Sequence, residues 1–481
     1  MKWCFLINNA PSLSEFFGKL SGQILKRNDE CLIILTSKMA EYSKKKFFPE
    51  GVKFISFIDW CAYNHKKENE EFFGVSWKES FPLFYRNGVV RIDYNKSVEI
   101  TLQTVQFIKF IFENEKPDVI VSESPTGLLH EVARRFCAKF KIPYLGLEDS
   151  RLIDRLELYD SYSDFDKVFI QLSSNDISKE EKKYAQKFVE GFISHTIASV
   201  DYRNFGEIHF SQVGIIKHYL KRLKEVAWIL LKYLTEKKSS KSLDYDSEII
   251  FRRALLSPFI MEKRQFRIFS QKNIFSKISE KDKDFFLFPL QLQPESSTYV
   301  CATYYCDQLN TIKNISLTLP FPYKIYVKEH PASVGKRPRS FYKELKKIPN
   351  LVLIDPYENM QEIIKKSDGV ITLTSTVGME AALAGKPVYV LGRVFYSYHP
   401  FCRRVNNFDE LKSKIKYDLT NKPNVDNLED INNRFVTACL RNTIKGSIVS
   451  ASNNKDDIND YEQILDNLKN ILIKYELKII E

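Results

Sequence analysis

The feature that most constrains the fold is a series of short apolar runs within residues 285–400, separated by helix-like segments. The runs lie at residues 323–327, 351–355, 369–374 and 387–392. Buried strands that alternate with helices at this spacing are typical of βαβ units. We therefore predict a parallel sheet with helices packed on its faces.

Polar residues follow two of these runs, where an open α/β sheet binds its ligands. His330 and Pro331 follow the first run, and Ser375 and Thr376 follow the third. His330, which lies near Lys328, is expected to donate a hydrogen bond to a phosphate oxygen. The two strand ends are therefore predicted to share one binding site.

The segment after the third run has the signals of a helix start. Ser375 and Thr376 can cap a helix over about residues 377–384. The free N–H groups and partial positive charge of a helix start suit a phosphate. Gly378 keeps side-chain bulk off the first turn, and Glu380 is placed where a carboxylate can accept hydroxyl groups of a ribose.

Each of these residues also has an ordinary structural explanation. A Ser-Thr pair often only caps a helix, a single histidine often lies on the surface, and a glutamate near a helix start suits the helix dipole. Together, on successive strand ends of one sheet, they favour a site for a nucleotide sugar with one or two phosphates.

Several stretches resemble the capsule polysaccharide biosynthesis family. They are PLQLQPESST at residues 289–298, the Asp307-Gln308 pair, VKEHP at 327–331 and TSTVGMEAALAGKPV at 374–388. The family includes bacterial β-Kdo transferases and has a GT-B glycosyltransferase fold. The same HP and Ser/Thr motifs are similar to those of bacterial GT-B sialyltransferases.

The resemblance extends over about residues 285–396 and has consequences for the donor. It implies a nucleotide-sugar donor, and a CMP-linked one because the best-known members use CMP-activated sugars. It implies no other cofactor. It also implies that Gln293, Glu295 and Ser296 line the donor pocket, together with the residues named above.

The N-terminal half repeats the strand–helix pattern. Apolar runs at residues 3–8, 31–36, 52–58 and 118–122 are expected to be strands, and helical periodicity follows the first of them at 13–26. We therefore predict a second Rossmann-like domain.

Two predicted strands of this half end in acidic residues. Glu123 follows one strand, and Pro125 and Gly127 then shape a tight loop into a helix. Glu148 and Asp149 end the next strand. All three are candidate catalytic carboxylates. Glu123 is ranked first because of its loop, since Glu148 and Asp149 can also pair with nearby arginines or cap the next segment.

Residues 209–238 have apolar residues at helical spacing with Lys and Arg between them. A basic amphipathic helix that contains Trp228 can lie on an anionic membrane surface. A helix that buries its apolar face inside the protein explains the same pattern, and we favour that interpretation.

Composition limits the remaining possibilities. The chain has 481 residues, 44% of them hydrophobic, and a net charge of +11. The charge suits a nucleotide, an acidic glycan or anionic lipid, and no zinc-ligand spacing or RNA-binding motif points to nucleic acid. The eight cysteines include no CxxC pair, and no apolar run is long enough to cross a membrane. A cytoplasmic protein, peripheral at most, is expected.

The expected fold is α/β and GT-B-like, with two Rossmann-like domains whose parallel sheets face each other across a cleft. The expected domains are residues 1–160, with the acceptor and catalytic groups, a basic helical connection at 161–280, the nucleotide-sugar domain at 281–405 and C-terminal helices at 406–481.

The expected activity is transfer of Kdo or another CMP-activated acidic sugar to a surface-polysaccharide or lipid-linked glycan acceptor. No metal is expected, because the chain has no obvious DxD pair of the type that metal-dependent GT-A transferases use. Asp244-Tyr-Asp246 has the spacing but lies in a hinge-like polar stretch and not after a strand. The alternatives are a sugar 2-epimerase, a polyol-phosphate transferase, or a non-catalytic glycan-binding or export partner.

Overall fold

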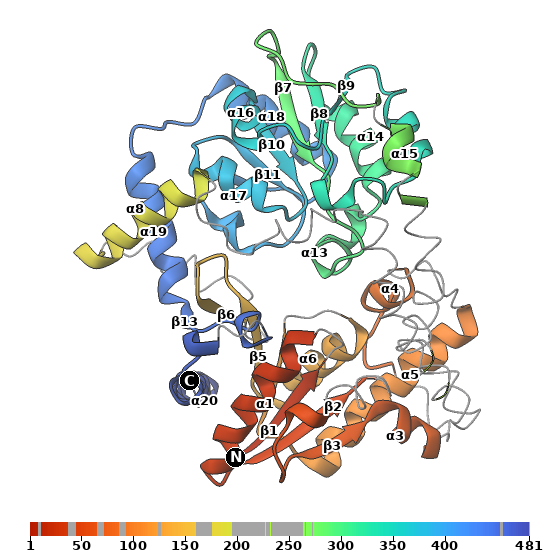
Figure 1. Ribbon diagram of the computed structural model, residues 1–481, viewed down its shortest axis with the longest axis vertical. Coiled ribbons are helices and arrows are strands. Elements are labelled where there is room, and N and C mark those ends of the chain that lie inside the picture. Colours follow the sequence, from red (N-terminus) through yellow and green to blue (C-terminus); the bar gives the residue numbers. More distant parts are fainter. Residues whose placement is uncertain are drawn as a thin grey trace. The chain divides into compact units, whose positions relative to one another are not determined.

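The computed structural model places most of the chain in two compact units, shown in Figure 1. The first unit comprises Met1–Asp164, Phe210–Leu256 and Leu440–Glu481, and the second comprises Phe165–His209 and Ser257–Cys439. The structure describes residues 1–7, 11–36, 45–64, 72–85, 93–123, 127–159, 176–194, 227, 231, 263–264, 266–271, 273–452 and 456–480.

Residues 281–405 contain all of one sheet, and residues 1–160 contain the other except for its strand at Thr443–Lys445. The region expected at 406–481 is shared, because residues up to Cys439 belong to the second unit and those from Leu440 belong to the first. The helix expected at 209–238, apart from residues 227 and 231, and the Asp244-Tyr-Asp246 stretch lie outside the described residues.

The first unit is built on a mixed sheet of seven strands in the order β13-β6-β5-β4-β1-β2-β3. Strands β1 to β5 are parallel, and β6 pairs antiparallel with both β5 and β13. Its elements are β1 (Lys2–Ile7), α1 (Pro11–Lys26), β2 (Glu30–Leu35), η1 (Lys45–Phe47), β3 (Lys53–Ser56), α3 (Phe57–Tyr63), α4 (Trp77–Tyr85), α5 (Tyr94–Phe110), the π-helical turn η2 (Ile111–Glu115), β4 (Val119–Glu123), α6 (Leu128–Phe140), β5 (Tyr144–Asp149), β6 (Arg155–Tyr159), β13 (Thr443–Lys445) and α20 (Tyr461–Ile480).

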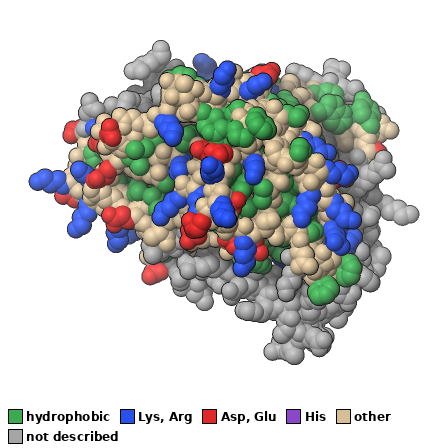
Figure 2. Space-filling view, turned by 90° about the horizontal axis from the view of Figure 1, so that it is seen from above, with side chains coloured by type: hydrophobic (Ala, Val, Ile, Leu, Met, Phe, Trp, Pro, Cys, Tyr) green, Lys and Arg blue, Asp and Glu red, His purple; other side chains and the backbone are tan. Residues whose placement is uncertain are grey.

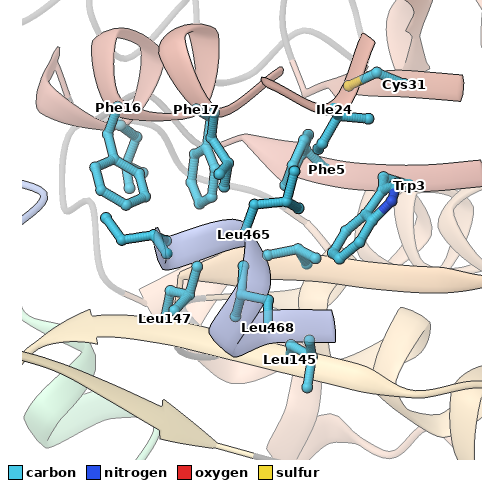
Figure 3. Packing of buried hydrophobic residues seen from close by; sticks show 14 of the residues in the cluster. Trp3, Phe5, Phe16, Phe17, Ile24, Cys31, Leu145, Leu147, Leu465 and Leu468 are labelled. Carbon is cyan, nitrogen blue, oxygen red and sulfur yellow. The ribbon is translucent and has the colours of Figure 1, made fainter. Parts of the chain in front are cut away.

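The C-terminal helix α20 completes one face of this sheet. Leu465 and Leu468 are fully buried against the α1 residues Phe16 and Phe17 and the β5 residue Leu147, as Figure 3 shows. Because neighbouring strand residues point to opposite faces, the same strands fill a second core on the other side. The last helix of the chain is therefore part of the N-terminal core.

The second unit is built on six parallel strands in the order β12-β11-β10-β7-β8-β9. In chain order this is the 3-2-1-4-5-6 arrangement of a Rossmann sheet. Its elements are α8 (Lys179–Ile193), β7 (Phe285–Pro289), α13 (Ser296–Tyr299), η3 (Thr303–Tyr305), α14 (Gln308–Thr318), β8 (Lys324–Lys328), η4 (Pro331–Ser333), α15 (Arg339–Leu345), β9 (Leu351–Ile354), α16 (Met360–Lys366), β10 (Gly369–Thr372), α17 (Thr376–Leu383), β11 (Val388–Val390), η5 (Phe395–Tyr398), β12 (Cys402–Arg404), α18 (Phe408–Thr420) and α19 (Leu428–Arg441).

The expected fold class is confirmed in its two Rossmann-like sheets, with corrections to the strand assignments. Strands β6, β7, β12 and β13 were not predicted, and β13 lies in a region that was predicted to be helical. Strands β6, β12 and β13 are short and lie at or near a sheet edge, where pairing with a neighbouring strand outweighs the weak local pattern.

The strand expected at residues 52–58 is also shorter than predicted. It ends at Ser56, whose hydroxyl accepts a hydrogen bond from the Asp59 N–H at 3.3 Å and caps α3. A serine followed three residues later by an acidic residue is a helix-start signal that the apolar run concealed.

Further observations concern the cysteines, membrane-spanning helices, metal sites and the charges on the surface. All eight cysteines are free and six of them are buried. No helix among the described residues is long and apolar enough to cross a membrane, and the described part of the chain contains no group of acidic, His and Cys side chains arranged to hold a metal. On the face seen in Figure 2, Lys and Arg side chains are interspersed with Asp and Glu.

Candidate functional site

The loops predicted to bind a donor lie at one edge of the second sheet. Strands β7 and β10 are neighbours in the sheet. From β7 the chain adds β8 and β9 on one side, and from β10 it adds β11 and β12 on the other side. The gap between β7 and β10 is therefore the topological switch point. Gln293 and Glu295 follow β7, Ser375 follows β10, and His330 follows β8, which is the other neighbour of β7. The sheet therefore brings the predicted donor loops together.

The start of α17 presents two hydroxyl groups. The Ser375 hydroxyl accepts a hydrogen bond from the Val377 N–H at 3.3 Å, and the Thr372 hydroxyl accepts one from the Ser375 N–H at 3.1 Å. Since the Ser375 oxygen acts as an acceptor in the cap, its hydrogen remains free for an anion. Among the described residues the Thr376 hydroxyl has no hydrogen-bond partner. The hydroxyls of Ser375 and Thr376 are therefore both available to donate to a ligand.

His330 is held as a neutral ring. Its Nδ1 accepts a hydrogen bond from the Ala332 N–H at 3.1 Å, so the ring hydrogen is on Nε2. Burial, and to a lesser extent the positive charges of Lys328, Lys336 and Arg337, lower the pKa of His330 to about 4. The ring is therefore a neutral Nε2–H donor at neutral pH. Pro331 is exposed and begins the short helix η4.

A buried carboxylate that the sequence analysis missed anchors this loop. The Glu329 side chain is fully buried and accepts hydrogen bonds from the Arg337 Nε at 2.9 Å, the Tyr342 hydroxyl at 2.6 Å and the His330 N–H at 2.8 Å. The sequence signal for it was an acidic residue directly after a buried strand and directly before His330. Removing one partner of such a buried pair typically costs about 3–5 kcal/mol.

The loop after β7 is tied down by its glutamines. The Gln293 Nε2 donates to the Cys306 carbonyl at 2.7 Å, and the Gln291 N–H donates to the Gln308 Oε1 at 2.7 Å. The side-chain amide nitrogen of Gln293 thus helps to hold the loop. Glu295 accepts from the Ser297 hydroxyl at 3.1 Å.

Ser296, which the resemblance also placed in the pocket, is the first residue of α13 and is half-buried. It lies directly after Glu295 in the same loop. Its position is therefore on the β7 side of the switch point.

Lys328 and Glu380 are both buried, beneath the site. The Lys328 Nζ donates to the Pro356 carbonyl at 2.5 Å, and burial lowers the pKa of Lys328 to about 8. Glu380 accepts from the Gln361 Nε2 at 2.7 Å, and burial raises the pKa of Glu380 to about 7. Both side chains were expected to contact the donor, and both contact the protein here.

Gly378 has a structural reason that differs from the expected one. A Cβ atom at this position would lie 2.6 Å from the Tyr396 hydroxyl oxygen and 2.9 Å from two ring carbons. Tyr396 is buried, and its hydroxyl donates to the Ser375 carbonyl. The absence of a side chain therefore lets Tyr396 brace the start of α17.

The three candidate carboxylates occupy different environments in the first unit. Glu123 is the last residue of β4, which neighbours β1 at the switch point of that sheet. Asp149 accepts hydrogen bonds from the N–H groups of Ile448 and Val449 at 2.9 and 3.1 Å, and burial raises the pKa of Asp149. Glu148 points to the opposite face of β5 because strand side chains alternate.

Glu123 is therefore the candidate at a position where Rossmann sheets bind ligands. The contacts of Asp149 are those of a structural link to the C-terminal segment. Pro125, which was expected to shape the loop after Glu123, lies outside the described residues.

Comparisons with known proteins agree with the motif analysis. Residues 245–414 match the sequence model of the family described as "Capsule polysaccharide biosynthesis protein". No curated protein matches the chain.

Solved structures with similar folds include KpsC of Thermosulfurimonas dismutans, described as a beta Kdo 2,7 transferase. It has 15% identity and a TM-score of 0.31, and the match covers 76% of this chain and 91% of that chain. The UDP-GlcNAc 2-epimerase of Neisseria meningitidis bound to UDP-GlcNAc has 14% identity and a TM-score of 0.25, with 99% and 100% of the two chains covered.

We predict that Gly378→Ala lowers stability by about 1–3 kcal/mol, because the new methyl group must displace the Tyr396 ring or the helix. Gly22→Ala in α1 is the matched control, since a Cβ there meets nothing within 4 Å. The control is expected to stabilise α1 by up to about 1 kcal/mol. Calorimetric melting measures both. A Gly378→Ala protein as stable as the wild type would contradict the assigned role of Tyr396.

Glu380 is predicted to make stability fall as pH rises. Its pKa rises on folding from the ordinary 4.5 to about 7, so the unfolded chain loses a proton that the folded chain keeps between these values. The contribution is present below about pH 4.5 and is lost as pH rises through 7. The free energy of unfolding of Glu380→Gln, relative to that of the wild type, should therefore be roughly 2–3 kcal/mol higher at pH 8 than at pH 5.

Urea unfolding at the two pH values measures this difference. Glu362→Gln, an exposed residue of α16, is the control and should show the same difference from the wild type at both. An equal effect of the Glu380 substitution at pH 5 and pH 8 would rule out a raised pKa.

Proposed function

We propose that this chain, whose residues 245–414 belong to the capsule polysaccharide biosynthesis family, is a glycosyltransferase that moves a sugar from a nucleotide to a hydroxyl group of a glycan. The observation that most supports this proposal is that hydrogen-bond donors follow the carboxyl ends of the two strands that flank β7. They are the His330 Nε2–H and the hydroxyls of Ser375 and Thr376, at the ends of β8 and β10.

In this proposal the donors stabilise the leaving phosphate. Negative charge on the phosphate grows as the bond to the sugar breaks, and preorganised donors lower the barrier to that step. The first turn of α17 adds the partial positive charge of a helix start. The charge is met by hydrogen bonds and the helix dipole, so the proposed reaction does not invoke a metal.

The family resemblance makes a CMP-activated acidic sugar, such as Kdo, the preferred donor. The acceptor is proposed to be a surface polysaccharide or a lipid-linked glycan. A carboxylate of the N-terminal unit would act on the acceptor hydroxyl as a general base or support the anomeric carbon. Glu123 is proposed first because of its place at the end of β4, and Glu148 and Asp149 follow it.

The donor site is tested by nucleotide binding. A thermal-shift screen with CMP, UDP, GDP and CDP-linked ligands should show the largest stabilisation with CMP ligands, since a ligand that binds only the folded state raises its melting temperature. His330→Ala, and Ser375→Ala with Thr376→Ala, should each weaken binding by roughly 1.5–3 kcal/mol per lost charge-assisted hydrogen bond. Calorimetry measures the affinities.

The control for the hydroxyl variants is Ser413→Ala with Thr420→Ala. Both residues are exposed on α18 and donate to backbone carbonyls of their own helix. This pair should leave nucleotide affinity unchanged. Unchanged affinity in the His330 and Ser375–Thr376 variants as well would place the donor elsewhere.

The carboxylate is tested by turnover. Glu123→Gln should abolish sugar transfer while nucleotide binding persists, because the proposed donor residues belong to the other unit. Glu148→Gln and Asp149→Asn are measured in parallel, and Asp149→Asn should lower the melting temperature because its carboxylate accepts two backbone N–H groups. Product analysis separates transfer from epimerisation. Near-normal turnover in all three would overturn the assignment of catalysis to these residues.

A further inference from the structure

We infer that Arg337 is a positioning residue that clamps the loop after β7 to the loop after β8, and so fixes Gln293 and His330 relative to each other. The inference deepens the proposed function and rests on it for its consequence, which is donor affinity. The clamp itself is a property of the fold of the second unit.

The guanidinium of Arg337 reaches both loops at once. Its Nε donates to the Glu329 Oε2 at 2.9 Å, its Nη2 donates to the Gln291 carbonyl at 2.6 Å, and its Nη1 lies 3.5 Å from the Gln293 Oε1. Glu329 belongs to the β8 end and the two glutamines belong to the β7 loop. A planar fork with donors in fixed directions can hold three acceptors, which a lysine ammonium cannot do in the same geometry.

The β8 half of the clamp leads to His330. Glu329 has no exposed side-chain surface, and its second oxygen accepts the His330 N–H at 2.8 Å. A carboxylate with this burial keeps its place only when a cation compensates it, and Arg337 is the cation that contacts it. The backbone position of His330 therefore depends on Arg337 through Glu329.

The β7 half of the clamp leads to Gln293. Its Oε1 faces Arg337 while its Nε2 donates to the Cys306 carbonyl at 2.7 Å. The loop after β7 is thereby held from both sides. Among the described residues, loss of the Arg337 fork would leave the Cys306 carbonyl as the one hydrogen-bond partner of this side chain.

Arg337 is itself immobilised in the protein. Its side chain is 12% exposed, its guanidinium carbon lies 4.9 Å from the centre of the Phe341 ring, and its carbonyl accepts from the Gln271 Nε2 at 3.0 Å. All three of its guanidinium nitrogens face protein acceptors. This arrangement is that of a residue that positions others, so it is not assigned as a catalytic residue.

Tyr342 provides a matched control within the same network. Its hydroxyl donates at 2.6 Å to the same Glu329 oxygen that Arg337 contacts. It has no hydrogen bond to the β7 loop among the described residues. Tyr342→Phe therefore removes a buried hydrogen bond from Glu329 and leaves the link between the loops in place.

The test compares Arg337→Lys, Tyr342→Phe and wild type as full-length chains. Two measurements are made: the CMP dissociation constant by calorimetry, and hydrogen exchange of the backbone amides at 291–296 without ligand. Arg337→Lys should raise the dissociation constant at least tenfold and speed exchange in that loop. Tyr342→Phe should lower the melting temperature and leave both measurements within twofold of wild type.

A second variant covers the case in which Arg337→Lys does not fold. Glu329→Gln with Arg337→Gln removes both charges and leaves no unpaired buried carboxylate. It should also lose CMP affinity and speed exchange at 291–296, since the fork to the β7 loop is gone.

The outcomes separate the clamp from the proposed function. Unchanged exchange at 291–296 in the folded Arg337 variants would overturn the clamp, with or without a nucleotide. Faster exchange with an unchanged CMP dissociation constant would overturn its role in donor affinity. Failure of the wild type to bind CMP would overturn the proposed donor, while the exchange measurement would still decide the clamp.

Discussion

The pairing of β7 with both β8 and β10 is the constraint on which the candidate site depends. Phe286 is in register with Ile325 of β8 and with Gly369 of β10, so all three strands run in the same direction and end at the same edge. Gly369 is necessary at this contact, because a Cβ there would lie 2.8 Å from the Pro387 carbonyl and 3.3 Å from the Phe286 ring. The register of three strands thus determines where the polar loops meet.

Buried polar groups at this edge serve mainly to hold the loops. Glu329 is compensated by Arg337, and the Lys328 ammonium donates to a backbone carbonyl. The groups proposed to bind the phosphate are neutral hydrogen-bond donors at the ends of β8 and β10. Donors held in place by the protein need little reorganisation when negative charge develops on a phosphate, and this lowers the barrier to the reaction.

Two titratable groups of the site, His330 and Glu380, respond to pH in opposite ways. His330 has a depressed pKa of about 4, so its contribution to stability is lost as pH falls from its ordinary 6.5 toward 4. Glu380 has a raised pKa, so its contribution is lost as pH rises toward 7. Both shifts have burial as their largest cause, which reflects how deeply the sheet edge is packed.

The sequence by itself determined the α/β class, the strands β8 to β11 and the start of α17, because apolar runs, Gly-Lys-Pro stops and Ser-Thr caps are local signals. Only the tertiary structure decided that α20 completes the N-terminal core and that Gly378 makes room for Tyr396. It also decided that Glu329 pairs with Arg337. Each of these depends on contacts between segments that are separated in the chain, and no local pattern encodes which distant side chain fills a given space.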